Sequence, residues 1–217
     1  MKEFDAAVVG SGPNGLTAAI TLAQAGHSVV VLESADDIGG GARTRELTAP
    51  GFHHDVCSAI HPMAISSPFL QTLPLDQHGL EWIHPDAPLA HPLDDRPAAM
   101  LERSLEDTAA TLAADGSKYL SWMKPWIPRW DGLCADALAP LGIPNHPIWM
   151  AQFGLSAFRA ATKLAHSRFN EPEAKALFAG LAGHSVMPLD MSPSSAIGIM
   201  LGIAGHAVGW PMPKGGS

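Results

Sequence analysis

The stretch from Phe4 to Thr44 decides the fold, and it reads FDAAVVGSGPNGLTAAITLAQAGHSVVVLESADDIGGGART. Residues 4–9 are apolar and partly β-branched and are followed by a glycine, which predicts a buried parallel strand. Apolar residues then recur at helical spacing as far as a glycine at position 26, and residues 28–32 form a second β-branched run. We therefore expect a strand–helix–strand unit at the start of the chain.

The glycines between the first strand and the helix predict a site for a dinucleotide. Gly10 allows a sharp turn, Gly12 lets a pyrophosphate approach the backbone, and Gly15 lets the helix pack closely on the strand. Pro13 suits the first helical turn, where its missing N–H is no loss, and the positive end of the helix dipole favours a pyrophosphate. A tight turn without a ligand would not need these three glycines together with the acid that follows the second strand.

That acid and a second glycine loop favour FAD over NAD. Glu33 directly follows the second strand, where a carboxylate can accept hydrogen bonds from ribose hydroxyls and would repel the 2′-phosphate of NADP. Residues 39–41 are all glycine, so their bare backbone can lie against a second part of the cofactor, and Arg43 can neutralise a pyrophosphate. A simple NAD domain does not need this second loop. The alternative for Arg43 is a surface ion pair with Glu46.

Three segments resemble the N-terminal part of the FAD-dependent phytoene dehydrogenase and amine oxidase superfamily, in its phytoene desaturase-like branch. They are VVGSGPNGLTAAITLAQAGHSVVVLE, DIGGGARTRE and PGFHHDVCSAIHP. In that family the first binds the ADP half of FAD, the second contacts the pyrophosphate and ribityl region, and the third lies towards the flavin ring. The resemblance implies FAD as the cofactor and these binding residues, the last two near the isoalloxazine: Gly10, Gly12, Pro13, Asn14, Gly15, Glu33, Gly40, Gly41, Ala42, Arg43, Thr44, Ser58 and His61.

The third segment also contains a cluster of polar residues. Residues 45–62 are predicted to form two strands joined by a turn, and neighbours such as His53 and His54 then point to opposite faces. Their spacing matches no recurring metal site, so we expect no metal. Cys57 has no flanking cation or helix start to lower its pKa and is predicted to be a buried structural thiol. His61 is either a donor near the flavin or a loop residue.

Beyond residue 67 the composition changes and a helical region is expected. Residues 81–84 and 98–101 are strand candidates with a turn at 94–97, and Ser104 caps a helix that ends at Asp115-Gly116. Further helices are expected to begin at Asn170 and at Ser192.

Two sets of apolar side chains recur at helical spacing in this region. Phe153, Ala157, Ala161 and Leu164 form one stripe. Trp122, Trp126 and Trp130 form another, which nearby prolines interrupt. Core packing is the favoured interpretation of the tryptophans, and a wall of a substrate cavity is the alternative.

The predicted fold class is α/β, with a Rossmann-like FAD-binding βαβ region in residues 1–67. Residues 68–217 are predicted to form a partial, mostly helical substrate-binding region with a short strand pair. In the family the chain continues beyond the glycine pair that ends this sequence, so the fold is expected to be truncated at its C-terminus. The resemblance implies an FAD-dependent oxidoreductase that oxidises a small apolar organic substrate by hydride transfer, with no catalytic acid or base identified. The alternatives are an NAD-dependent dehydrogenase and a truncated, non-catalytic nucleotide-binding scaffold.

The composition of the chain indicates which partners and which cellular location to expect. The chain has 217 residues, is 47% hydrophobic and carries a formal charge of −8, which argues against a nucleic-acid surface. Its two cysteines suggest a reducing compartment. The first strand follows the N-terminus directly, without a signal peptide, and the apolar run 196–204 is too short to span a bilayer. We therefore expect a cytoplasmic protein.

Overall fold

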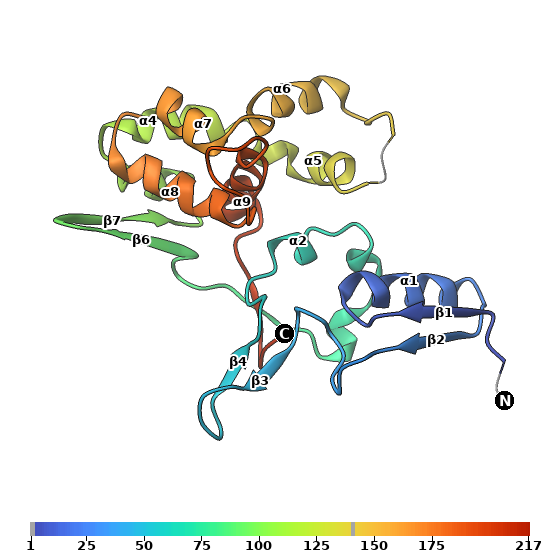
Figure 1. Cartoon of the computed structure of the whole chain (residues 1–217). Helices are drawn as coiled ribbons and strands as arrows, with labels where there is room; N and C mark the ends of the chain where they lie inside the picture. The colour runs from blue at the N-terminus through green and yellow to red at the C-terminus, as the bar shows by residue number, and fades with distance from the viewer. Residues whose placement is uncertain (1–2, 140–141) are drawn as a thin grey trace. The chain divides into compact units, whose positions relative to one another are not determined.

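The computed structural model describes residues 3–139 and 142–217 and divides them into two compact units (Figure 1). The first unit contains the chain as far as His61, together with Leu73–Ile83 and Met212–Ser217. The second unit contains Pro62–Thr72 and His84–Pro211. The predicted division between residues 67 and 68 falls inside the Pro62–Thr72 segment.

The first unit is built on the predicted strand–helix–strand. Strands β1 and β2 are parallel, with Ala6 opposite Val29, and α1 packs against both of them (Figure 1). Strands β3 and β4 form an antiparallel pair, and β5 pairs with β8. The elements of this unit are β1 (Ala6–Val9), α1 (Pro13–Gln24), β2 (Val29–Leu32), β3 (Thr44–Glu46), β4 (His53–Asp55), the 3₁₀ turn η2 (Leu75–His78), β5 (Trp82–Ile83) and β8 (Met212–Pro213).

The second unit is mostly helical and holds the hydrophobic core. Helices α8 and α9 pack against each other, and Leu177, Leu181 and Ile203 are fully buried. The hairpin β6–β7 packs on α8. The elements of this unit are α2 (Pro62–Ile65), η1 (Leu70–Thr72), β6 (Leu89–Leu93), β7 (Arg96–Leu101), α3 (Leu105–Ala110), η3 (Ala113–Asp115), α4 (Gly116–Met123), η4 (Ile127–Arg129), α5 (Trp130–Ala137), α6 (Pro147–Ala157), α7 (Ala161–Arg168), α8 (Pro172–Gly183) and α9 (Ser195–Ala207).

The predicted helix starts are correct to within a few residues. The Ser104 hydroxyl accepts a hydrogen bond from the Asp107 amide at 3.1 Å and caps α3. Helix α8 begins at Pro172, and α9 begins at Ser195, three residues later than predicted. No helix in the described part of the chain is long and apolar enough to cross a membrane.

The predicted end of the helix after Ser104 is wrong. Helix α3 ends at Ala110, and Gly116 begins α4 instead of stopping α3. A side chain at Gly116 would overlap the carbonyl of Ala109, so the glycine lets α4 start against the end of α3. Asp115 is buried, and its carboxylate accepts hydrogen bonds from the amides of Asn170 and Glu171 at 2.6 Å each, which fixes this corner.

Neither apolar stripe lies on a single helix. Trp122 belongs to α4 and Trp130 begins α5, with Trp126 between them. The three side chains are only 7%, 9% and 2% exposed, so the core interpretation is confirmed. The second stripe is divided between α6 and α7, and its four members are also buried.

The strand pairing also differs from the prediction. β5 pairs with β8, more than a hundred residues further along the chain, and β7 pairs with β6, which the sequence did not indicate. The pairing register of β6 with β7 shifts between His91 and Leu93, at Pro92, which has no N–H to donate to the neighbouring strand. The predicted turn after residue 93 does form, at Asp94-Asp95.

Candidate functional site

The first glycine loop joins β1 to α1 in the geometry that the sequence predicted. Gly10 has φ +94° and donates its amide to the carbonyl of Leu32 at 2.7 Å. A side chain at Gly15 would overlap the Gly10 carbonyl, so the helix can approach the strand only with glycine there. Gly12 is the N-cap of α1, Pro13 is its first residue, and no side chain caps the helix. Amides of its first turn are therefore available to a ligand.

The second glycine loop lies in backbone contact with the first. Gly40 has φ +60°, and a Cβ on it would lie 3.0 Å from the Cα of Gly12. The Gly39 amide donates to the carbonyl of Ser11 at 3.0 Å. The turn is closed by the Ala42 amide, which donates to the Gly39 carbonyl at 2.9 Å. The two loops thus form one surface of bare backbone.

Arg43 stands at the end of this second loop with an unused donor. Its Nε is buried and has no hydrogen-bond partner among the described residues. The ion pair considered for Arg43 and Glu46 is not among those formed by the described residues, and the Glu46 carboxylate accepts from the Gly51 amide at 2.9 Å. It is Arg45 that is paired, through a 2.6 Å bond from its Nε to Asp37. A guanidinium with a buried, unpaired N–H can serve an anionic ligand.

Glu33 is held by protein donors on both carboxylate oxygens. One oxygen accepts from the amide and hydroxyl of Ser11 at 2.8 and 2.6 Å, and the other accepts from the amides of Ser34 and Ala35 at 2.8 and 2.9 Å. These bonds, with the Ser11 hydroxyl foremost, lower the pKa of Glu33 to about 2. Ser11 is fully buried and was not among the predicted site residues, although its place between two glycines is the signal that marks it.

The segment that follows β4 lies alongside the second glycine loop. The Ser58 amide donates to the Gly41 carbonyl at 3.1 Å, and the Val56 amide donates to the Arg43 carbonyl at 2.9 Å. Ser58 therefore lies next to Gly41, another of the predicted cofactor residues. Cys57 lies between these two amides and is exposed, so its prediction as a buried thiol is wrong. The backbone bonds on either side fix the main chain and leave this side chain at the surface.

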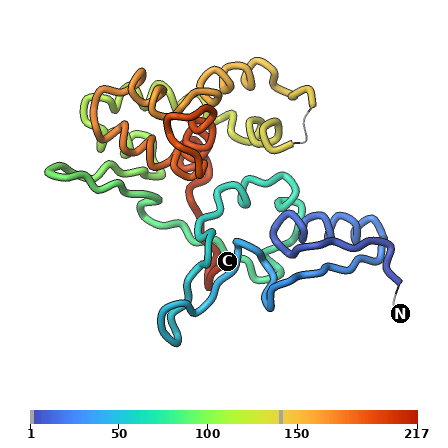
Figure 2. Tube along the Cα trace, viewed as in Figure 1, coloured from blue at the N-terminus to red at the C-terminus, as the bar shows by residue number. Residues whose placement is uncertain are grey.

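The last residues of the chain return to this region (Figure 2). The Ser217 amide donates to the carboxylate of Asp55 at 2.9 Å, and the Thr44 hydroxyl donates to the same oxygen at 2.6 Å. The Ser217 hydroxyl lies 2.8 Å from Nε2 of His61. Asp55 and Ser217 were not predicted as site residues, because no local pattern connects positions so far apart.

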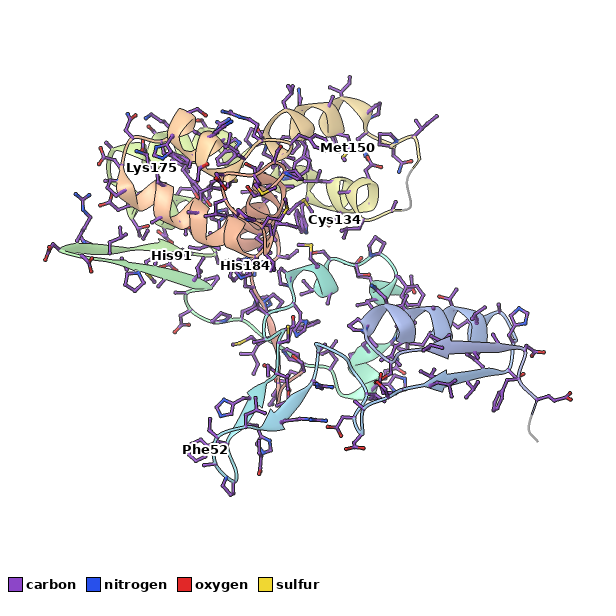
Figure 3. All side chains as sticks on the ribbon, viewed as in Figure 1. Phe52, His91, Cys134, Met150, Lys175 and His184 are labelled. Carbon is purple, nitrogen blue, oxygen red and sulfur yellow. The ribbon has the colours of Figure 1, made fainter. Side chains whose placement is uncertain are left out.

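Other polar residues of the β3–β4 pair contact one another or the turn between the strands. Nε2 of His54 lies 2.8 Å from the Thr48 hydroxyl, and Nε2 of His53 lies 3.9 Å from Glu46. Phe52, at the turn between the strands, projects away from the ribbon (Figure 3) and is 63% exposed. In the described ranges, three or more potential metal ligands do not come together. Asn14, the remaining predicted cofactor residue, is exposed in the first turn of α1.

A parallel β1–α1–β2 unit with a glycine loop at the helix start defines a Rossmann-like dinucleotide-binding protein. Residues 8–73 match the family described as "NAD(P)-binding Rossmann-like domain". The chain is 31% identical over 129 residues to a component of the limonene dehydrogenase of Castellaniella defragrans and 35% identical over 118 residues to putrescine oxidase of Kocuria rosea. It is also 40% identical over 80 residues to pyridine nucleotide-disulfide oxidoreductase domain-containing protein 2 of Rattus norvegicus. The predicted resemblance to an amine oxidase and to a pyridine nucleotide-disulfide oxidoreductase domain protein is therefore confirmed.

Solved structures give the same fold. A variant of putrescine oxidase matches with a TM-score of 0.57 at 20% identity, and cyclohexylamine oxidase from Brevibacterium oxydans matches with a TM-score of 0.50 at 16% identity. The first match covers 98% of this chain and 46% of the oxidase. The sequence alignments cover 59% and 54% of this chain but only 21% and 20% of the limonene dehydrogenase component and the Kocuria oxidase. The chain therefore spans half or less of the length of these relatives, and it has the predicted mixed α/β architecture.

Proposed function

We propose that the first unit binds FAD and that the protein is an FAD-dependent oxidoreductase, dehydrogenase- or desaturase-like, acting on a small apolar organic substrate. Two observations together carry this proposal. The backbones of Gly12 and Gly40 are in contact, and the second glycine loop is followed by Arg43, whose Nε is buried and unpaired among the described residues. A mononucleotide-binding βαβ unit needs only the first glycine loop for a pyrophosphate. The second loop and Arg43 would add contacts to a cofactor that extends beyond the first glycine loop, as FAD does.

The residues present fit such a cofactor. The free amides at the start of α1 and the guanidinium of Arg43 would hold the pyrophosphate, and the glycines would let it approach the backbone. Glu33 would bind the ribose of the ADP half. Both of its oxygens already accept protein donors, so a ribose hydroxyl would take the place of a serine hydroxyl. When bound, the flavin supplies the redox chemistry by accepting a hydride from the substrate.

The substrate is assigned by class only. The relatives named above act, by their names, on limonene, which is apolar, and on putrescine, which is a diamine. We favour an apolar substrate and place its binding site in the mostly helical part of the chain, residues 68–217. A cytoplasmic location is part of the same proposal, since Cys57 and Cys134 are both free thiols.

Titration of the full chain with FAD and, separately, with NAD⁺ tests the proposal. Quenching of FAD fluorescence should report binding, and calorimetry should give a much weaker affinity for NAD⁺. Arg43→Gln should weaken FAD binding about tenfold, because it removes a charged donor from the pyrophosphate. The matched control, Arg45→Gln, removes a guanidinium that is already paired with Asp37 and should change the affinity less than about twofold.

Two results would overturn the proposal. Tight binding of NAD⁺ without binding of FAD would favour an NAD-dependent dehydrogenase. Failure to bind either dinucleotide would leave a scaffold without a cofactor. If FAD binds, anaerobic bleaching of the flavin absorbance by a candidate substrate then tests the oxidoreductase activity.

A further inference from the structure

We infer that Ser217 and Asp55 are positioning residues of the FAD site, which fix the hydrogen-bonding state of the His61 ring. This inference rests on the proposed function, because His61 belongs to the segment expected near the flavin. It adds a part of the chain that follows β8 to a site otherwise built from the first sixty-one residues. It also gives His61 a defined chemical role in place of the two alternatives left by the sequence.

The contacts form a continuous network within the first unit. Asp55 accepts two hydrogen bonds on one carboxylate oxygen, from the Ser217 amide and the Thr44 hydroxyl. Thr44 is also a proposed cofactor residue, and its side chain packs so closely on Gly216 that a Cβ there would overlap it. The end of the chain is therefore held against the second glycine loop by hydrogen bonds and by close packing.

The direction of the bonds at Ser217 determines the tautomer of His61. The Ser217 hydroxyl lies 2.9 Å from the carbonyl oxygen of Ser58 and 2.8 Å from Nε2 of His61. A carbonyl only accepts, so the single hydroxyl hydrogen is donated to Ser58. The ring nitrogen must then be the donor in the second contact. A neutral His61 therefore carries its hydrogen on Nε2, and Nδ1 is an acceptor.

The charge state of the ring follows from its surroundings. Burial lowers the pKa of His61, although the Asp55 carboxylate and the Ser58 carbonyl both favour the charged ring. Glu81, just before the neighbouring β5, and Lys214, just beyond β8, pair with each other at 2.8 Å. The indole of Trp82 lies beside the imidazole, with ring centres 6.2 Å apart, and carries no charge. His61 is thus neutral at physiological pH and offers Nδ1 to an N–H or O–H of the cofactor or substrate.

Nuclear magnetic resonance of the full chain labelled with ¹⁵N-histidine tests this assignment without any cofactor. His61→Gln identifies the His61 signals, and long-range ¹H–¹⁵N correlations report its tautomer. The wild type should show a neutral ring protonated at Nε2. Ser217→Ala should mix the two tautomers and move the pKa of His61 upwards, towards its ordinary value, because it opens the ring to water. Ser217→Thr keeps the hydroxyl and should restore the wild-type signals, and Ser121→Ala, on the second unit, should leave them unchanged.

A second readout connects the network to the cofactor. Ser217→Ala should weaken FAD binding about threefold to tenfold, and Ser217→Thr less than about twofold. If Ser217→Ala leaves the tautomer and pKa of His61 unchanged, or shifts them without changing FAD affinity, the inference is overturned while the FAD site stands. If the wild type does not bind FAD, the proposed function fails, whatever the state of His61.

Discussion

The two units of this protein differ in the interactions that stabilise each of them internally. In the described part of the first unit, Ala19 is the single buried apolar side chain, and Val9 and Leu32 on the parallel strands are 84% and 53% exposed. The second unit buries large apolar side chains completely, among them Leu177 and Phe178. Among the described residues, apolar burial therefore contributes less to the first unit than to the second.

Hydrogen bonds and glycine contacts order the first unit instead. The carboxylates of Glu33 and Asp55 each accept several protein donors, and the two glycine loops meet backbone to backbone. Polar contacts of this kind contribute less free energy than apolar burial, but they fix geometry. Polar contacts therefore determine the geometry of the first unit, whereas apolar burial stabilises the second. A bound dinucleotide should therefore stabilise the first unit most.

Removing a core side chain should show the largest difference between the units. Leu177→Ala, at a fully buried position in α8, should lower the free energy of unfolding by about 3 kcal/mol, because it leaves a cavity. Leu32→Ala, at the exposed last residue of β2, should cost less than about 1 kcal/mol. Urea unfolding followed by circular dichroism measures both. Equal costs would mean that Leu32 is buried as deeply as Leu177 and would break the comparison.

Truncating one carboxylate in each unit should give a smaller contrast. Asp115→Ala removes a buried acceptor for the amides of Asn170 and Glu171 and a partner of Lys118, and it should cost about 2 kcal/mol. Asp5→Ala removes an exposed acceptor for the amide and hydroxyl of Ser28 and should cost clearly less than Asp115→Ala, because water can replace the lost acceptor. The same urea titrations apply. A larger loss of unfolding free energy in Asp5→Ala than in Asp115→Ala would contradict the comparison, because it would mean that the exposed carboxylate stabilises its unit more than the buried one.

The glycine contact can be tested by a matched pair of alanine substitutions. Gly40→Ala puts a Cβ 3.0 Å from the Gly12 Cα and should weaken FAD binding about tenfold by separating the loops. Gly51→Ala suffers a similar backbone strain, since both glycines have positive φ, but a Cβ at Gly51 meets nothing within 4 Å. Its FAD affinity should stay within about twofold of the wild type. Equal losses in the two variants would attribute the effect to backbone strain alone.

Acid should weaken the first unit through Glu33, which is the smallest effect considered. The folded pKa of Glu33 is about 2 and its ordinary value is 4.5, so the stability it contributes is complete above about pH 4.5 and is lost as the pH falls towards 2. Glu33→Gln should flatten the pH dependence of hydrogen exchange in residues 6–33 over this range. Glu46→Gln is the control. An unchanged acid response in Glu33→Gln would show that its bonds to Ser11 do not stabilise the fold.

The sequence predicted those parts of the fold and site that depend on neighbouring residues. The strand–glycine–helix unit followed from Gly10 to Gly15, and the cap of α3 followed from Ser104, because turn and cap geometry are local. Contacts across long stretches of chain left no such signal. The pairing of β5 with β8 and the bond from Ser217 to Asp55 connect positions more than a hundred residues apart.

The breaks in the helical region were also missed for a physical reason. Side chains at helical spacing identify a buried face but not the turn between two helices that share it. Phe153 and Leu164 are both buried, yet they belong to different helices. The burial was therefore predicted correctly and the continuity of the helix was not.

Hydrogen exchange of the full chain with and without FAD tests the central claim most directly. FAD should slow exchange of the amides in residues 10–15 and 39–44 and leave those of α8, in the second unit, unchanged. Arg43→Gln should reduce this protection at the same FAD concentration. If saturating FAD protects neither glycine loop, or protects α8 instead, the first unit is not the dinucleotide site and the account is contradicted.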